Sequence, residues 1–157
     1  MTLYFLRHGH ADHPGWTGRD DDRPLTREGI ENMRLEARTM ANLGIKVDVV
    51  VTSPLPRAQE TAELVARGVG AGGSIAVDPR LAPGFGPGAL NEILAEHRGR
   101  GDLMLVGHEP DFSHTIGELT GGRVVMKKGG LARLDSVSGE GGAWQLIWLL
   151  PPRILTL

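Results

Sequence analysis

The sequence of 157 residues contains no cysteine. This absence excludes a cysteine nucleophile, thiolate-bound zinc and disulfide bonds, and it fits a reducing compartment, so we expect a cytoplasmic protein. Basic residues are not in excess either, because 17 Lys and Arg stand against 19 Asp and Glu, giving a formal net charge of -2. We therefore expect no nucleic-acid partner, and any cationic pocket must be local.

The N-terminus lacks both a basic region and a long apolar stretch. Met1-Thr2 leads directly into a short apolar run, so we expect no signal peptide and no membrane span. Glycine and proline number 23 and 10 residues, below the share of about 25–30% that is typical of disordered chains. The length suffices for one hydrophobic core, and the sequence predicts a single domain over residues 1–157.

What the sequence does contain is an alternation of two apolar periods. Short β-branched or apolar runs predict strands at residues 3–6, 47–51, 74–77, 103–106, 131–134 and 144–150. Helical spacing follows Thr26 as N-cap and stops near Gly44, and it returns after Ser53-Pro54, around Leu90 and around residues 112–119. This alternation predicts a three-layer α/β/α fold with a mostly parallel sheet and antiparallel closing strands, joined by a glycine-rich turn at residues 138–142.

Three predicted strands end in residues suited to binding an anion. Arg7 and His8 follow the first strand, Arg57 lies shortly after the second, and His108 follows the fourth. Because the carboxyl ends of parallel strands share one edge of a sheet, where open α/β folds bind ligands, we expect these four side chains to converge. Gly9 is expected to allow a sharp turn there and to leave room for an anion beside the backbone.

This set of residues predicts phosphoryl-transfer chemistry. Arg7 and Arg57 would bind the phosphoryl oxygens through charge-assisted hydrogen bonds. An imidazole with an unprotonated nitrogen, His8, would attack phosphorus. His108, if protonated, would offset charge that develops in the transition state.

Four blocks of the sequence carry a family resemblance. They are Arg7-His8-Gly9, Leu25-Thr26-x-x-Gly29, Thr52-Ser53-Pro54-Leu55-x-Arg57-Ala58-x-x-Thr61-Ala62 and Val106-Gly107-His108-Glu109-Pro110. In order and spacing they resemble the histidine phosphatase superfamily, which has the phosphoglycerate mutase-like fold, and above all its small SixA-like phosphohistidine phosphatases. The resemblance implies a phosphohistidine intermediate on His8, phosphate contacts from Arg7, Arg57 and His108, and neither metal nor cofactor.

The sequence departs from the family pattern at two positions. Larger members carry a general acid after the third strand, whereas the stretch from Arg80 to Phe85 has no acidic residue, and Pro14 stands where mutase-like members have an asparagine. A general acid is worth ~10²–10⁴ in rate when the leaving group needs a proton, which an alkoxide needs far more than an imidazole. The sequence therefore favours cleavage of a P–N bond. Six carboxyl groups remain as alternative proton donors: Asp12, Asp20, Asp21, Asp22, Glu109 and Asp111.

The expected partner is accordingly a phosphate-bearing substrate, by preference phosphohistidine on a protein. A small-molecule phosphomonoester phosphatase is the alternative within the same chemistry, and a binding module without turnover is a third. A more distant alternative is a zinc-dependent metallo-β-lactamase-like hydrolase, because His8, His10, Asp12 and His13 fit the pattern H-x-H-x-D-H. That alternative leaves the Arg57 and His108 blocks unexplained.

Two further features have structural interpretations. Lys127-Lys128 is interpreted as a charged guard on an edge strand, or else as a contact for a protein substrate. Trp144 and Trp148 are expected on one face of the last strand, in the core or at an interface.

Overall fold

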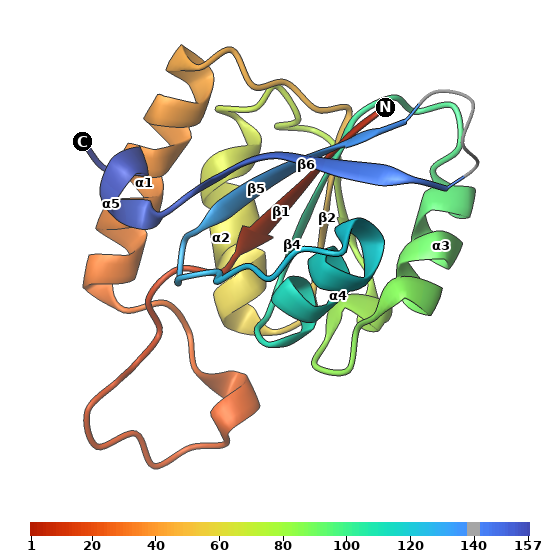
Figure 1. The fold of residues 1–157 in the computed structure, drawn as a ribbon. Helices are drawn as coiled ribbons and strands as arrows, with labels where there is room; N and C mark the ends of the chain where they lie inside the picture. Colours follow the sequence, from red (N-terminus) through yellow and green to blue (C-terminus); the bar gives the residue numbers. More distant parts are fainter. Residues whose placement is uncertain (138–141) are drawn as a thin grey trace.

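One six-stranded sheet organises the protein, whose structure is a computed structural model describing residues 1–137 and 142–157 (Figure 1). The strands are β1 Thr2–Arg7, β2 Val49–Thr52, β3 Ile75–Val77, β4 Leu103–Gly107, β5 Leu131–Ser136 and β6 Trp144–Leu150. The α-helices are α1 Arg27–Asn42, α2 Pro56–Ala66, α3 Pro87–Glu96, α4 Asp111–Thr120 and α5 Pro152–Leu155, with 3₁₀ turns η1 Asp20–Asp22 and η2 Pro79–Leu81. No helix in the described residues is long and apolar enough to span a bilayer.

The strand order is β3-β2-β4-β1-β5-β6, and its first four members are parallel. β5 runs antiparallel to β1, and β6 runs antiparallel to β5. The predicted fold class, a mostly parallel sheet with antiparallel closing strands, is thus confirmed. The predicted turn between β5 and β6 falls largely on residues 138–141, which lie outside the described residues.

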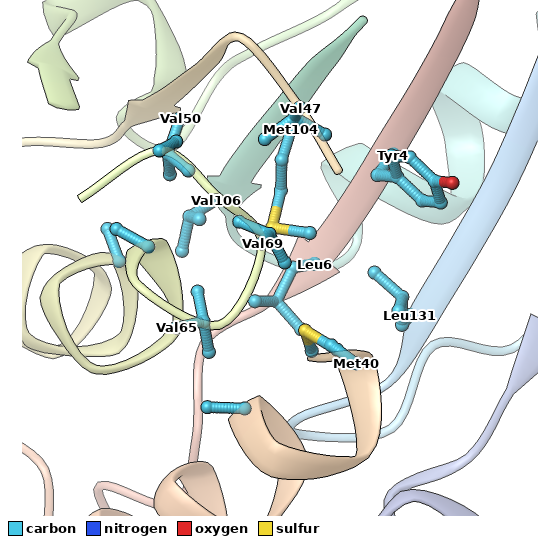
Figure 2. Packing of buried hydrophobic residues seen from close by; sticks show 14 of the residues in the cluster. Tyr4, Leu6, Met40, Val47, Val50, Val65, Val69, Met104, Val106 and Leu131 are labelled. Atoms are coloured by element: carbon cyan, nitrogen blue, oxygen red, sulfur yellow. The ribbon is translucent and has the colours of Figure 1, made fainter. Parts of the chain in front are cut away.

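Side chains of β1 alternate between two buried clusters, one on each face of the sheet. Tyr4 and Leu6 pack against α1, α2 and α5, and Figure 2 shows them with Met40 and Val65. Leu3 and Phe5 pack toward η2, α3 and α4 on the opposite face. Burying an aliphatic or aromatic side chain contributes roughly 1.5–3 kcal/mol, so the two clusters hold the strand ends in place.

Local signals set the ends of the helices. The Thr26 hydroxyl accepts a hydrogen bond from the Gly29 N–H at 3.0 Å, which confirms the predicted N-cap of α1. Gly44 and Gly121 follow α1 and α4 with φ of +73° and +77°, the left-handed conformation that stops a helix. α2 begins later than expected, since Pro56 rather than Pro54 occupies its first turn.

The expectation that Trp144 and Trp148 share a face of β6 is wrong. The pairing of β6 with β5 shifts register between Arg133 and Leu134, so that Ile147 is the extra residue of a β-bulge. Trp148 therefore packs in the same cluster as Tyr4, and Trp144 packs in the cluster on the other side.

The edge-strand role of Lys127-Lys128 is also wrong. Both residues precede β5 in irregular structure, and β5 is an inner strand of the sheet. The Lys128 ammonium pairs instead with the carboxylate of Asp12.

Candidate active site

The ends of β1, β2 and β4 lie next to each other and carry the predicted site residues. Arg7, the last residue of β1, pairs with Gly107 of β4. The ladder continues one step further, because the His8 N–H donates to the Gly107 carbonyl at 3.1 Å and the Ser53 N–H donates to the Val106 carbonyl at 3.0 Å. These backbone bonds fix the starting points of all three loops.

His8 is held in one tautomer. Its Nδ1 lies 2.7 Å from the Gly9 carbonyl, which can only accept a hydrogen bond. Nδ1 therefore carries the proton, and Nε2 is unprotonated. The Arg57 Nε–H donates to that Nε2 at 3.3 Å. Burial, aided by the positive charges of Arg57 and Arg7, lowers the pKa of His8 to about 3. At neutral pH the ring is therefore uncharged, as a nucleophile must be.

His108 lies beside His8, with 5.2 Å between the ring centroids. It is 3% exposed, and its Nε2 is 2.7 Å from the Ser53 hydroxyl. Burial and, more weakly, the charge of Arg57 lower the pKa of His108 to about 4. The free protein at neutral pH thus holds an imidazole here and not the imidazolium that the sequence-based hypothesis considered.

Two guanidinium groups complete the cluster. Arg7 Nη1 donates to the Met126 carbonyl at 2.9 Å, while its buried Nε has no partner among the described residues. Arg57 Nη1 donates to the Asp20 carbonyl at 3.2 Å. Burial lowers the pKa of both groups, but an arginine side chain stays protonated in proteins. The structure thus places two cations, the buried Arg57 and the half-buried Arg7, and two neutral imidazoles close together, a composition suited to a phosphoryl group.

The loop of residues 19–23, which carries the three aspartates of η1, lies against this cluster. Arg23 holds the loop in place. Arg23 Nε donates to the Asp20 carboxylate at 2.9 Å, and its Nη1 donates to the Asp12 carboxylate at 3.2 Å. Lys128 binds the same Asp12 and helps to lower its pKa. Two of the candidate proton donors, Asp12 and Asp20, are therefore held in ion pairs with basic groups.

The remaining candidate acids differ in whether a protein group already donates a hydrogen bond to them. Glu109 accepts hydrogen bonds from the backbone and hydroxyl of Ser113, and Asp111 accepts one from the Gly84 N–H at 2.7 Å. Asp21 and Asp22 are exposed on η1, and the charge of Asp21 acts on both Arg57 and His108. Of the six candidates, Asp21 is the one whose charge acts on both of these groups.

The four residues of the zinc pattern do not form one site. His10 Nδ1 lies 2.8 Å from the Thr26 hydroxyl, and His13 Nε2 lies 2.7 Å from the Pro24 carbonyl. No group of three potential ligand side chains is close enough to share a metal ion within residues 1–137 and 142–157.

The structure explains why a glycine stands at position 9 differently from the sequence-based expectation. Its φ is not positive, and a Cβ there would lie 2.8 Å from Met33 Cγ and 3.3 Å from a methyl group of Leu25. The space beside Gly9 is filled by α1 and its N-terminal loop, not left for an anion.

The sequence predicts Thr61 on the inner face of the second helix but assigns it no part in the site. Its hydroxyl accepts the Gly9 N–H at 3.1 Å and donates to the Arg57 carbonyl at 2.7 Å, which ties the loop after β1 to α2. The signal was present, because Thr61 stands one helical turn after Arg57 on the same face.

Comparison with known proteins agrees with this geometry. The family model described as "Histidine phosphatase superfamily (branch 1)" matches residues 3–84. An uncharacterised protein of Picosynechococcus sp. is 35% identical over 87% of this chain and 86% of its own length. Phosphohistidine phosphatase SixA of Escherichia coli is 28% identical over 78% of this chain and 76% of its own length.

Solved structures give the same result. A structure of the protein histidine phosphatase SixA complexed with tungstate superposes with a TM-score of 0.87 and 26% identity, covering 99% of both chains. A structure described as the putative phosphohistidine phosphatase SixA from Agrobacterium tumefaciens superposes with a TM-score of 0.80 and 25% identity, covering 96% of this chain and 98% of that one. The chain belongs to the histidine phosphatase superfamily and is a phosphatase.

Proposed function

We propose that this phosphatase hydrolyses phosphohistidine on a protein, through an intermediate phosphorylated on His8. The observation that carries the proposal is the state of His8, a buried neutral imidazole whose Nδ1 is bound to a carbonyl and whose Nε2 faces a guanidinium. Such a ring presents one unprotonated nitrogen in a fixed direction, as nucleophilic catalysis requires.

The reaction follows from these positions. His8 Nε2 attacks the phosphorus of a phosphohistidine whose other ring nitrogen carries a proton. The bond from phosphorus to the substrate nitrogen breaks with its electron pair staying on that nitrogen, so that the substrate leaves as a neutral imidazole. Arg7, Arg57 and His108 bind the phosphoryl oxygens and stabilise the charge of the transition state. Water then attacks the phosphorus bound to His8, releasing inorganic phosphate and restoring the neutral ring.

The surroundings favour a leaving group that needs little help from an acid. Asp12, Asp20, Glu109 and Asp111 are each engaged by a hydrogen-bond donor of the protein. A substrate imidazole that carries a proton on its other ring nitrogen leaves readily as a neutral ring, because the conjugate acid of that ring has a pKa near ~6.5, whereas an alkoxide needs a proton in the transition state. The likeness to SixA proteins supports the same substrate class, and the tungstate named in one of those structures is a tetrahedral oxyanion like phosphate.

The test compares two substrates and two variants. A phosphotransfer domain phosphorylated on histidine should turn over at least ~10²-fold faster than glycerol phosphate, which is the lower bound of what a missing general acid costs. Rapid-quench mapping should find the label on His8, and His8→Ala should lose both label and turnover. The matched control His114→Ala changes an exposed histidine of α4 and should retain both. Full activity in His8→Ala would refute the mechanism.

A small-molecule phosphomonoester phosphatase is the second candidate, and the position of Asp21 favours it. Its exposed carboxyl group acts on Arg57 and His108, so it could protonate an alkoxide that leaves from this side. Equal rates on the two substrates, with a loss confined to glycerol phosphate in Asp21→Asn, would select this candidate.

A further inference from the structure

The contact between Ser53 and His108 assigns a role to a residue outside the four expected ones. Ser53 is fully buried, and its hydroxyl oxygen lies 2.7 Å from His108 Nε2. The Leu55 N–H donates to the same oxygen at 3.2 Å. No other acceptor for the hydroxyl proton lies within hydrogen-bond distance in the described part of the chain, so the Ser53 O–H donates to Nε2.

This direction of donation decides where His108 carries its proton. A neutral imidazole has one N–H, and the nitrogen that accepts a hydrogen bond is the unprotonated one. With Nε2 as acceptor, the N–H is on Nδ1. That atom is buried and has no hydrogen-bond partner among residues 1–137 and 142–157. Nδ1–H is therefore the one donor of His108 that no described protein group takes up, on a ring that lies beside His8.

We propose that Ser53 is a positioning residue that fixes the Nδ1–H tautomer of His108, so that this ring donates a hydrogen bond to the transferring phosphoryl group while it is uncharged. The inference rests on the proposed function and refines it. It replaces the protonated His108 of the sequence-based hypothesis with a neutral donor, and it gives Ser53 a reason to stand at the end of β2.

The charges around His108 support a neutral donor. Arg57 and Arg7 disfavour its protonation, whereas Asp111 and Asp21 favour it, and burial outweighs all four. The neighbouring ring of His8 is uncharged at neutral pH. A bound phosphoryl group adds negative charge, but a donor that needs no proton from solution works at any pH above the range in which the two rings become protonated.

The first experiment reads the tautomer directly. In ¹⁵N-histidine-labelled protein at pH 7.5, His108 should show a protonated Nδ1 and an unprotonated Nε2, and Ser53→Ala should lose this preference. The conservative variant Ser53→Thr keeps the hydroxyl and should keep the tautomer. A wild-type His108 protonated on Nε2 would overturn the inference, even if the protein turns over no phosphohistidine at all, in which case the proposed function fails separately.

The second experiment follows kinetics with the phosphorylated domain. Ser53→Ala should lower kcat by about 10- to 100-fold with little change in KM, somewhat less than the ~10²–10³ of a deleted transition-state donor. The ratio of its kcat to that of the wild type should rise as the pH falls, because the neutral His108 of the variant no longer keeps its proton on Nδ1, whereas a protonated His108 carries a proton on both nitrogens. Ser53→Ala/His108→Ala should be no slower than His108→Ala.

A control separates this role from the loss of a buried hydroxyl in general. Thr115 of α4 has a buried hydroxyl without a partner in the described residues, and Thr115→Val should keep wild-type kcat and pH profile. An additive loss in the double variant, or an unchanged kcat in Ser53→Ala, would overturn the inference. If Ser53→Ala fails to fold, the tautomer of His108 in the wild type and in Ser53→Thr still tests the inference.

Discussion

Arg57 contacts both His8, the proposed nucleophile, and the loop of residues 19–23. Its Nε–H donates to His8 Nε2 and its Nη1 donates to the Asp20 carbonyl. A lysine has the same charge but no planar fork, so it cannot make both contacts and bind a phosphoryl group. We expect Arg57→Lys to lower kcat/KM for the phosphorylated domain by ~10²-fold or more, as the loss of a transition-state donor does.

The matched control for this prediction is Arg27→Lys. Arg27 is on the exposed side of α1, where it pairs with Glu31 one helical turn away, and its replacement should leave kcat/KM unchanged. If Arg57→Lys retained wild-type kcat/KM while Arg27→Lys did as well, the fork of Arg57 would have no part in binding the phosphoryl group.

At the scale of single residues, the sequence predicts the groups that come straight after strands. Arg7, His8 and His108 follow β1 and β4, and the parallel register alone brings them together. Ser53 and Thr61 could not be assigned in this way, because hydroxyl groups are common and their roles depend on which partner lies within about 3 Å. The protonation state of His108 also required burial, which no local pattern reports.

At the scale of elements, β1 and α1 meet at Gly9 with no space between them. A Cβ on Gly9 would lie 2.8 Å from Met33 Cγ, so Gly9→Ala must displace either α1 or the loop that carries His8. We expect a loss of about 1–3 kcal/mol in the free energy of unfolding, together with reduced kcat. Urea unfolding and turnover of the phosphorylated domain measure the two effects.

The contact with Met33 provides the control for Gly9. The double variant Gly9→Ala/Met33→Ala removes the overlap. Its loss in the free energy of unfolding should therefore be smaller than the sum of the losses in the two single variants. Gly73→Ala, where a Cβ meets nothing within 4 Å, should be close to wild type. Strictly additive losses in the double variant would mean that Gly9 is needed for a reason other than Met33.

Helices and strands with a regular apolar pattern could be predicted from the sequence, but a shift in strand register could not. The continuous apolar runs of β1 and β4 predict strands that are buried on both faces of the sheet, and the structure confirms it. In β6 the same reasoning fails at Ile147, because a bulge shifts the register by one residue and moves Trp148 to the other face. A bulge is set by pairing with β5, so the sequence of β6 alone does not indicate it.

At the scale of the whole molecule, stability depends on buried groups that avoid charge. The pKa of His8 is lowered to about 3 and that of His108 to about 4, both chiefly by burial. Below pH ~6.5 the unfolded chain therefore binds more protons than the folded protein, and the free energy of unfolding decreases as the pH falls. These two rings set the acidic side of the stability profile.

Glu36 sets the alkaline side. This residue of α1 is fully buried, neither carboxyl oxygen has a hydrogen-bond partner in the described chain, and burial raises its pKa to about 9. Between its ordinary pKa of 4.5 and about 9 the folded protein holds one more proton than the unfolded chain. The free energy of unfolding therefore decreases as the pH rises through this window, by up to ~1.4 kcal/mol per unit.

Together the three groups place the maximum of stability near pH ~6.5, because the two histidines outweigh Glu36 below that value and Glu36 acts alone above it. Urea unfolding at pH 6.5, 7.5 and 8.5 should show a steady decline for the wild type. The isosteric variant Glu36→Gln does not titrate, so its free energy of unfolding should not decline over the same range, and the two histidines should raise it slightly between pH 6.5 and 7.5. A wild-type profile that is flat from pH 6.5 to 8.5, or a decline that persists in Glu36→Gln, would show that Glu36 does not hold a proton in the folded protein.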